Sequence, residues 1–444
     1  MRHYVISDLH LGMGWLEDKD NKKKWHPWED FMYDDQFKRY LDFIARDGGD
    51  ELIINGDWID FMQLEPVAYR AGLYSEDGHQ LGWTEADSMQ KLENCVAANA
   101  HKAFFDDLRS FLATTKVKLT IMMGNHDPDL FWPQVQQKVR ELLGAPDHSK
   151  LQFVRQSVMR GTAHIEHGNQ YCSPENKFFN PENITHKCTA DGKERLELNW
   201  GTIFVMEFFN DLETKLPFAD NLKTQSRALY LGIKNGWIRG RIVGLFIKFL
   251  VGAGIPWSSI VANVLSEQKR EPYQLIQQID DPQLRFELLK IYESEDSTKS
   301  AIDQEIALTP EEEWKAINQQ EHPPVTIDML TPDVEEASPT LGIFRDEPEF
   351  RGAADILKRP GIEYVIFGHT HTEIDGATPG AKIKKYFNTG SWVNSIDLSK
   401  KENRKRLKEI SDVDLTDNTL FDLRLRQAVI DVSDSETKVS LSQI

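Results

Sequence analysis

The chain has 444 residues, of which 40% are hydrophobic and 28% are charged, a composition typical of soluble globular proteins. This length is sufficient for a large core or for a core with a substantial insertion. The formal net charge of −19 at pH 7 argues against a general nucleic-acid-binding protein, because phosphate backbones need clustered lysine and arginine. We therefore expect no extended binding of duplex nucleic acid.

Cysteine content indicates the redox environment. The three cysteines, Cys95, Cys172 and Cys188, are sparse and show no CxxC spacing, which argues against a disulfide framework and against a thiolate zinc site. A reducing compartment fits this pattern. The first candidate metal ligand, Asp8, comes too early to leave room for the charged leader and apolar core of a signal peptide. We therefore expect a cytoplasmic protein.

Short apolar runs and amphipathic segments alternate along the chain. The first part contains predicted strands at 4–7, 51–55, 117–123, 151–158 and 162–166, and predicted helices at 34–46, 92–112 and 131–143. The last part contains predicted strands at 363–367, 382–388, 428–432 and 438–441. This alternation predicts an α/β fold, in which helices cover a mostly parallel or mixed sheet.

Five polar motifs follow predicted strands. They are Asp8-Leu9-His10, Gly56-Asp57, Gly124-Asn125-His126-Asp127, His167-Gly168 and Gly368-His369-Thr370-His371. Open α/β sheets bind ligands beyond the carboxyl ends of their strands, so these side chains should converge. Each motif alone would be an ordinary turn or a core histidine. Together they supply the carboxylate, carboxamide and imidazole groups that two neighbouring metal ions require.

Hydrolysis of a phosphate ester is the chemistry that needs such a set. Two adjacent cations lower the pKa of a bridging water, so that a metal-bridging hydroxide can attack, and they neutralise the charge of the in-line transition state. Asp57 is the natural bridge, and Asp8 and His10 can both turn toward one ion. The remaining candidate ligands are Asn125, His167, His369 and His371.

The motifs resemble those of the calcineurin-like metallophosphoesterase superfamily over residues 1–171 and 361–394. The resemblance implies a four-layer α/β/β/α sandwich and two divalent metal ions. We expect manganese, with iron or zinc as the alternatives, because the ligands include no thiolate. By matching motifs, Asp8, His10 and His371 would hold the first metal, Asn125, His167 and His369 the second, and Asp57 would bridge them.

The resemblance also implies a catalytic pair. In the family, the histidine of the Gly-Asn-His-Asp motif contacts the substrate and protonates the leaving oxygen; here it is His126, and Asp127 would orient its ring. His164 is the main rival of His167 as a ligand, but in a strand it would point to the opposite face. Asp60 could cap a helix or support the ligands, and we do not include it among the candidates.

The chain between the fourth and fifth motifs differs in character. We predict a metallophosphoesterase core at 1–172 and 352–444, interrupted by a large, partly helical insertion at 173–351. Residues 221–266 include six basic residues and no acidic one, with glycines at every fourth position from Gly232 to Gly244. We interpret this stretch as a buried helical lid whose basic side chains meet an anionic substrate. Peripheral contact with an anionic membrane surface is the alternative.

The predicted function is a metal-dependent phosphoesterase acting on a phosphomonoester, phosphodiester or pyrophosphate. One alternative is a lipid-linked or nucleotide-sugar pyrophosphatase at the membrane surface, since residues 167–171 are similar to those of UDP-2,3-diacylglucosamine diphosphatases. Those enzymes usually carry arginine in place of His126, so we do not assign their substrate. A single-strand nuclease is a second alternative. A non-catalytic scaffold is disfavoured because every ligand type is present.

Overall fold

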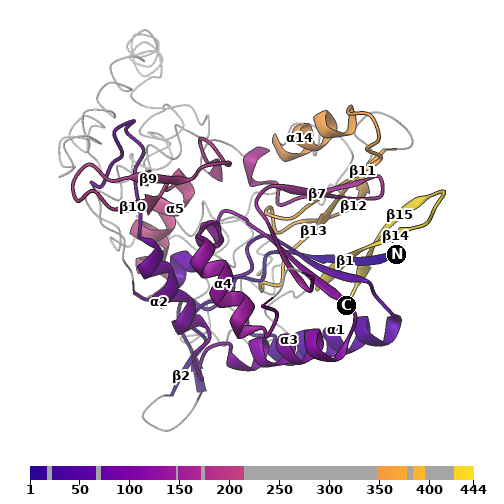
Figure 1. Cartoon of the computed structure of the whole chain (residues 1–444), viewed down its shortest axis with the longest axis horizontal. Helices are drawn as coiled ribbons and strands as arrows, with labels where there is room; N and C mark the ends of the chain where they lie inside the picture. The colour runs from indigo at the N-terminus through magenta and orange to yellow at the C-terminus, as the bar shows by residue number, and fades with distance from the viewer. Residues whose placement is uncertain are drawn as a thin grey trace, which may run out of the picture. The chain divides into compact units, whose positions relative to one another are not determined.

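The computed structural model (Figure 1) describes residues 1–17, 23–66, 72–146, 149–171, 176–214, 348–377, 384–395 and 425–444. The chain forms two compact units. One consists of Met1–Met206, Ala337–Ser395 and Leu415–Ile444, and the other of Glu207–Glu336 and Ile396–Asp414. In the second unit the described residues, 207–214, contain the end of the π-helix η5 (Val205–Phe209) and the short helix α6 (Asn210–Glu213). Both large sheets belong to the first unit.

The larger sheet has six strands in the order β15-β14-β1-β4-β5-β6. Its parallel strands are β1 (Arg2–Ile6), β4 (Glu51–Asn55), β5 (Lys118–Met122) and β6 (Leu151–Val154). The antiparallel strands β14 (Arg426–Val432) and β15 (Thr437–Gln443) complete it on the β1 side. Of these strands, β1, β4 and β5 are mostly buried, as expected for a sheet covered on both faces.

The second sheet has five strands in the order β12-β13-β11-β8-β7. They are β12 (Glu373–Ala377), β13 (Lys385–Thr389), β11 (Tyr364–Phe367), β8 (Ala163–Glu166) and β7 (Ser157–Arg160). The predicted single strand at 151–158 is therefore wrong, because the chain passes from β6 in one sheet to β7 in the other. The polar residues Arg155 and Gln156 lie between β6 and β7, where the chain leaves the first sheet.

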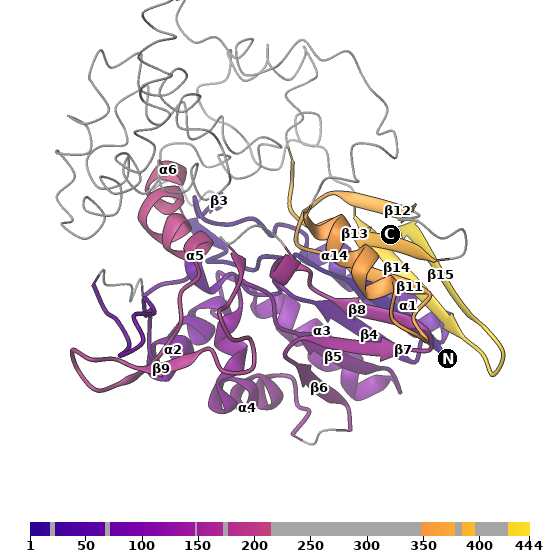
Figure 2. The same ribbon diagram turned by 90° about the horizontal axis from the view of Figure 1, so that it is seen from above.

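The two sheets pack face to face around a shared apolar core (Figure 2). Val5 and Ile53 of the larger sheet and Ile165 and Ile366 of the smaller one belong to this core and are fully buried. Such a layer contributes about 25 cal/mol per Å² of apolar surface removed from water, so it is the main source of the sandwich's stability.

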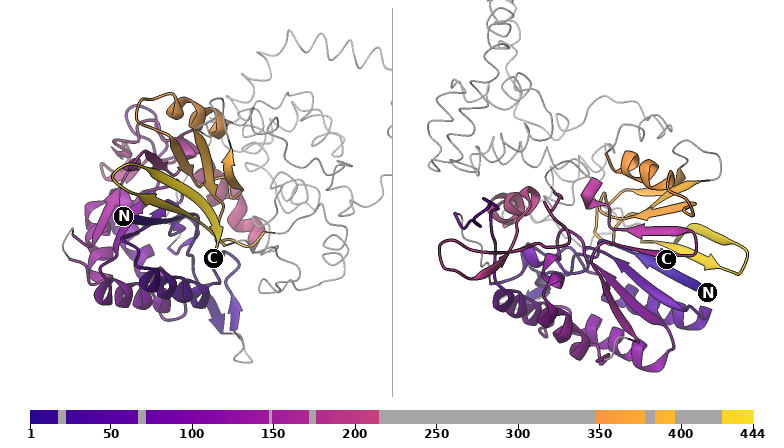
Figure 3. Two further views of the ribbon diagram at one scale, coloured as in Figure 1. Left: turned by 90° about the vertical axis from the view of Figure 1, so that its right-hand side faces the viewer. Right: turned by 45° about the horizontal axis from the view of Figure 1, so that its top comes forward.

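Helices cover the outer faces, completing the predicted α/β/β/α sandwich (Figure 3). Helices α1 (Asp34–Asp47) and α3 (Lys102–Thr114) lie beside the larger sheet, and the rings of Phe37 and Phe104 stack at 4.0 Å between them. Helix α14 (Pro348–Leu357) packs on the smaller sheet, where Phe350 joins the apolar cluster of β11 and β13. The predicted fold class is confirmed.

The other helices agree less closely with the sequence patterns. The predicted helix 92–112 is two helices, α2 (Glu85–Cys95) and α3, because the chain leaves the helical path to bring His101 within 3.1 Å of the buried carboxylate of Glu29. Helix α2 starts at a capping box formed by Thr84 and Asp87. Helix α4 (Pro133–Leu142) is preceded by the short helix η2 (Pro128–Phe131), and its first residue is proline, which suits that position.

Short elements absent from the prediction complete the unit. They are the strand pairs β2 (Trp15–Glu17) with β3 (Lys23–Trp25) and β9 (Thr185–Lys187) with β10 (Glu194–Leu196), and the helices η1 (Phe61–Gln63), η3 (Asn169–Tyr171) and α5 (Trp200–Phe204). Residues 176–206, which sequence analysis assigns to the insertion, belong to the same compact unit as the sheets.

A partly buried ion pair links the two sheets at the end opposite the motifs. Arg160 of β7 donates two hydrogen bonds of 2.5 Å to the carboxylate of Glu51 on β4, which also contacts His3 and Thr120. Burial would raise the pKa of Glu51, but the hydrogen bonds from Arg160 and His3 lower it to about 2. The pair therefore stabilises the fold above the ordinary glutamate pKa, and this contribution disappears as the pH falls toward 2.

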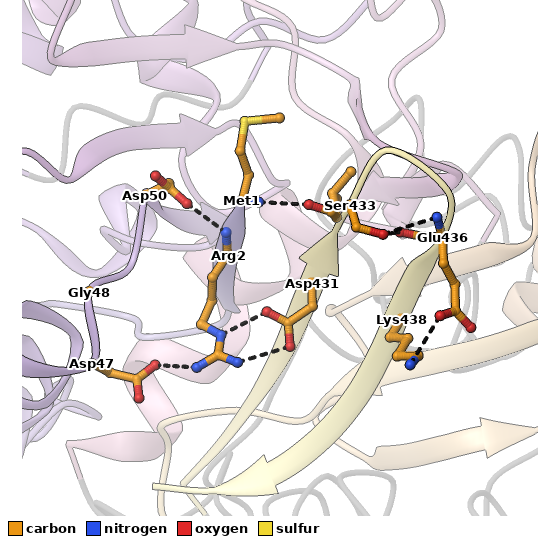
Figure 4. A pocket seen from close by; sticks show the side chains of 10 residues that line it. Met1, Arg2, Asp47, Gly48, Asp50, Asp431, Ser433, Glu436 and Lys438 are labelled. Carbon is orange, nitrogen blue, oxygen red and sulfur yellow. Dashed lines mark hydrogen bonds and ion pairs between the residues drawn. The ribbon is translucent and has the colours of Figure 1, made fainter.

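An exposed ion-pair cluster lies near the chain's first residues (Figure 4). Arg2 is 2.7 Å from both Asp431 and Asp47, and its side chain is 40% exposed. It lines an open cavity of about 530 Å³ whose other charged groups include Glu436 and Lys438, themselves 3.0 Å apart. Because these charges are paired with one another, we assign this cavity no ligand.

The two ion-pair sites should differ in their contribution to stability. We expect Arg160→Met to lower the free energy of unfolding by about 3–5 kcal/mol, because it leaves the buried Glu51 carboxylate without its guanidinium partner. The matched change Arg2→Met should cost less than about 1 kcal/mol, since solvent screens its partners. Urea denaturation at pH 7 measures both, and equal losses would contradict this assignment.

Candidate metal centre

The five motifs converge where the strands end. Asp8 and His10 follow β1, Asp57 follows β4, and Asn125 and His126 follow β5. The others, His167, His369 and His371, follow β8 and β11 of the second sheet. Because the sheets are stacked, loops distant in sequence meet at this edge.

The backbone at this edge is unusual. Among the described residues, the non-glycine residues with positive φ are Asp8, His10, Asp57, His369 and His371, with φ between 51° and 68°. Left-handed conformations cost a non-glycine residue about 1–2 kcal/mol each. All five are residues that the sequence predicts as metal ligands. The strain is therefore concentrated where side chains must leave the strand direction to reach a common point.

One group of ligand atoms comes from Asp8, His10 and His371, and these atoms lie within 4.8 Å of one another. The Nε2 atoms of the two histidines are 3.1 Å apart, and His371 Nε2 is 3.4 Å from Asp8 Oδ1. Asp8 and His10 are buried, whereas the His371 side chain is 37% exposed. This group contains the three residues predicted for the first metal, and it is open to solvent at His371.

A second group comes from Asp57, His167 and His369, again with ligand atoms within 4.8 Å. His167 Nε2 is 3.0 Å from Asp57 Oδ2 and 3.2 Å from Asn125 Oδ1. The rings of His167 and His369 are 5.3 Å apart between centroids. The donor atoms predicted for the second metal are thus brought together.

Asp57 lies between the two groups. Its Oδ2 is 3.0 Å from His167 Nε2 and 3.8 Å from His10 Nε2, and no hydrogen bond from a described residue satisfies this buried atom. Its Oδ1 accepts the backbone N–H of His126 at 2.9 Å. A buried carboxylate oxygen left without a donor, between two sets of imidazoles, fits a ligand shared by two cations.

Neighbouring groups fix which imidazole nitrogen faces the centre. His167 Nδ1 lies 2.8 Å from the carbonyl oxygen of Asn55, which can only accept, so Nδ1 carries the hydrogen. His10 Nδ1 lies 3.0 Å from Asp60 Oδ2. In both rings Nε2 is left facing the other ligands, the arrangement that second partners of metal-binding histidines impose.

The electrostatics of the cluster favour bound positive charge. Burial would lower the pKa of His167, but the carboxylates of Asp57 and Asp8 raise it to about 10. Burial and the neighbouring His167 lower the pKa of His369 to about 3. The carboxylates therefore favour positive charge at this position, which a bound divalent cation would also supply, and His369 is already a neutral ligand.

The prediction for Asp127 needs a correction. Its oxygens accept the backbone N–H groups of Trp58 at 2.8 Å and Gly124 at 2.6 Å, so it fixes the motif's loop instead of orienting the ring of His126. The ring is held by Asp60, whose Oδ2 lies 2.6 Å from His126 Nδ1. Asp60 was left out of the predicted site.

Asp60 combines both roles considered for it. Its Oδ1 accepts the backbone N–H of Met62 at 3.1 Å and caps η1, while its Oδ2 contacts His126 and His10. The feature of the sequence that could have identified Asp60 is its position three residues after Asp57, which places it in the same turn. Sequence alone could not show that two histidines from other loops share its carboxylate.

Two other predictions concern residues outside this cluster. His164 turns away from it, as predicted, and its Nε2 lies 2.9 Å from Glu166. The basic, glycine-containing stretch 221–266 lies outside the described residues, so the structure does not test its proposed role. Among the helices that are described, none is both long and apolar enough to span a membrane.

Comparison with known families agrees with this geometry. The model of the calcineurin-like phosphoesterase family matches residues 1–220, which carry the first four motifs. His369 and His371 lie beyond the matched residues, and the structure brings them to the same site. A search of curated proteins finds no match.

Gly56 lies directly against the side chain of His167. It has φ of 83°, and a Cβ atom there would overlap the imidazole ring of His167. Gly78 has nearly the same φ, 82°, but open space around it. We expect Gly78→Ala to cost about 1 kcal/mol of stability through backbone strain alone. Gly56→Ala should also displace His167 and weaken manganese binding by about 10–100-fold.

Calorimetric titration with manganese, together with urea denaturation, separates the two effects. Equal manganese affinity in both variants would show that Gly56 serves the turn and not the ligand.

Proposed function

Because the chain belongs to the calcineurin-like phosphoesterase family, we propose that it is a dinuclear metal-dependent hydrolase of a phosphomonoester, phosphodiester or pyrophosphate. The observation that supports this most strongly is the position of Asp57 between two ligand groups. A single metal ion would need only one group. Two neighbouring groups with a buried carboxylate between them favour the two-cation arrangement that in-line phosphoryl transfer uses.

The donor set indicates which cations to expect. Among the residues that the structure describes, carboxylate, carboxamide and imidazole groups surround the centre, and no cysteine is among them. Such ligands suit manganese, with iron or zinc as alternatives. When bound, the cations supply an activated water and offset the negative charge of the transferring phosphoryl group.

Within this site, the protein's own groups provide orientation. The carbonyl of Asn55 and the carboxylate of Asp60 hold the rings of His167 and His10 so that neither can rotate without losing a buried hydrogen bond. The partly exposed His371 lies on the side by which a substrate phosphate can approach. Preorganised ligands of this kind need no rearrangement during the reaction.

His126 is the proposed proton donor to the leaving oxygen. Its side chain is 21% exposed, so it can contact a bound ester, and its ring packs 4.5 Å from that of His10. Burial would lower the pKa of His126, but Asp60 and Asp57 raise it to about 9. The contact of 2.6 Å between His126 Nδ1 and the carboxylate of Asp60 favours the protonated ring, the state required of a general acid.

The function itself is tested by a phosphate-release screen with manganese. It includes nucleotides, phospholipids, sugar nucleotides and 4-nitrophenyl esters, and labelled single- and double-stranded DNA is assayed in parallel. We expect turnover of at least one ester class and a loss of at least about 100-fold in Asp57→Asn, since that change removes the shared carboxylate.

The control is Asp42→Asn on α1, whose side chain is 60% exposed. Hydrolysis that survives in Asp57→Asn at the level of this control would refute the proposal. Turnover confined to sugar nucleotides or to single-stranded DNA would favour the pyrophosphatase or the nuclease alternative, respectively.

The role of His126 predicts a dependence on the leaving group. His126→Ala should slow hydrolysis of an alkyl ester by about 100-fold or more, because an alkoxide needs a proton as it departs. A 4-nitrophenyl ester, whose leaving group is stable as an anion, should slow by less than about 10-fold. Steady-state kinetics on both esters with manganese-loaded protein measures this ratio. Equal slowing of the two substrates would assign His126 to another role.

A further inference from the structure

A lysine side chain is buried beneath the turn that carries Asp60. Lys91 of α2 is 0% exposed, and its Nζ donates a hydrogen bond of 2.6 Å to the carbonyl oxygen of Phe61. The ammonium group also lies 4.0 Å from the centre of the Trp83 ring. Within the described part of the chain it forms no ion pair closer than 4.0 Å. Its only hydrogen bond there is therefore to a neutral carbonyl.

Such an arrangement is costly. A buried ammonium loses its hydration, and one hydrogen bond does not replace it. Burial lowers the pKa of Lys91 to about 8, although Asp129 and Asp60 oppose this shift. A methionine of similar length would fill the same space without a charge. The position of the lysine therefore indicates a function for its hydrogen bond.

The residue that accepts this hydrogen bond, Phe61, is connected to His126 in two ways. The peptide group that accepts from Lys91 belongs to Phe61, whose own N–H donates to the backbone oxygen of His126 at 3.1 Å. Asp60 is the residue before Phe61, and its carboxylate contacts the ring of His126 at 2.6 Å. Lys91 thus holds Phe61, which contacts the backbone of His126. Phe61 also follows Asp60, which contacts the side chain of His126.

We propose that Lys91 is a positioning residue for proton transfer by His126, acting through the turn at Phe61. The inference rests on the proposed phosphoesterase function. The hydrogen bond and the ring contact of Lys91 involve Phe61 and Trp83, neither of which is a candidate ligand, so Lys91 acts by fixing the place of Asp60 and His126. Removing its hydrogen bond frees the carbonyl of Phe61 and lets the turn shift. His10, which also contacts Asp60, keeps the hydrogen bond from its backbone N–H to the carbonyl oxygen of Asp57.

The expected effect resembles a partial loss of His126. Lys91→Met should lower kcat for an alkyl phosphoester by about 10–100-fold, the range found when outer partners of a site are removed. A 4-nitrophenyl ester should slow by less than about 3-fold, since its leaving group does not depend on a proton. KM and the number of bound manganese ions should stay unchanged. Lys91→Gln, which retains a donor, should restore part of the lost rate.

A double-mutant cycle separates positioning from general stability. In the His126→Ala background, Lys91→Met should have no further effect on the alkyl ester, because the group it positions is absent. Lys102→Met on α3 is the matched control, since its side chain is 57% exposed and pairs with Asp106. This control should leave both rates as in the unchanged protein. Thermal unfolding and manganese content are measured for every variant.

Each outcome separates this inference from the function on which it rests. The inference is supported if Lys91→Met slows hydrolysis of the alkyl ester selectively and has no such effect in the His126→Ala background. Additive losses, equal slowing of both esters, or failure of both Lys91 variants to fold would overturn it and assign Lys91 to stability. Failure of the unchanged protein to hydrolyse any ester in the screen would instead refute the proposed function.

Discussion

The site depends on the concentration of buried charge around Asp57. Its carboxylate lies among three imidazole rings and close to Asp8, in a region almost closed to solvent. Without a compensating cation, such a cluster would be costly to bury. Burial would raise the pKa of Asp57, but the neighbouring His167 and His126 hold it well below its usual range. The fold therefore maintains an ionised carboxylate in a place where water cannot stabilise it.

The surrounding structure is built to keep that geometry. Five candidate ligand residues hold strained left-handed conformations, and glycine at Gly56 lets His167 approach the backbone directly. Beneath them, Asn55 and Asp60 set the orientation of individual rings, and the Glu51–Arg160 pair ties the two sheets together. Strain of this kind persists only where the rest of the fold over-determines the conformation. Precise ligand placement is the property that the proposed chemistry requires.

Sequence patterns predicted an α/β fold and the convergence of seven ligand candidates because both follow from local rules, whereas the four-layer sandwich was implied by the resemblance to the calcineurin-like family. Strands such as Glu51–Asn55 are continuous apolar runs, and each motif marks a strand's end. The sequence patterns gave wrong predictions where contacts between residues far apart in the chain determine the structure. The break between α2 and α3 depends on burying His101 against Glu29, and Asp60 instead of Asp127 holds His126 because their loops meet only in the folded chain. Neither contact has a local signature.

The central claim is that two cations share Asp57. The most direct measurement is anomalous X-ray diffraction from crystals of the manganese-loaded protein, collected above and below the manganese absorption edge. We predict two anomalous peaks about 3.5–4 Å apart, one beside Asp8, His10 and His371 and one beside Asn125, His167 and His369, with Asp57 between them. A single peak, or two peaks without Asp57 in contact with both, would contradict this account.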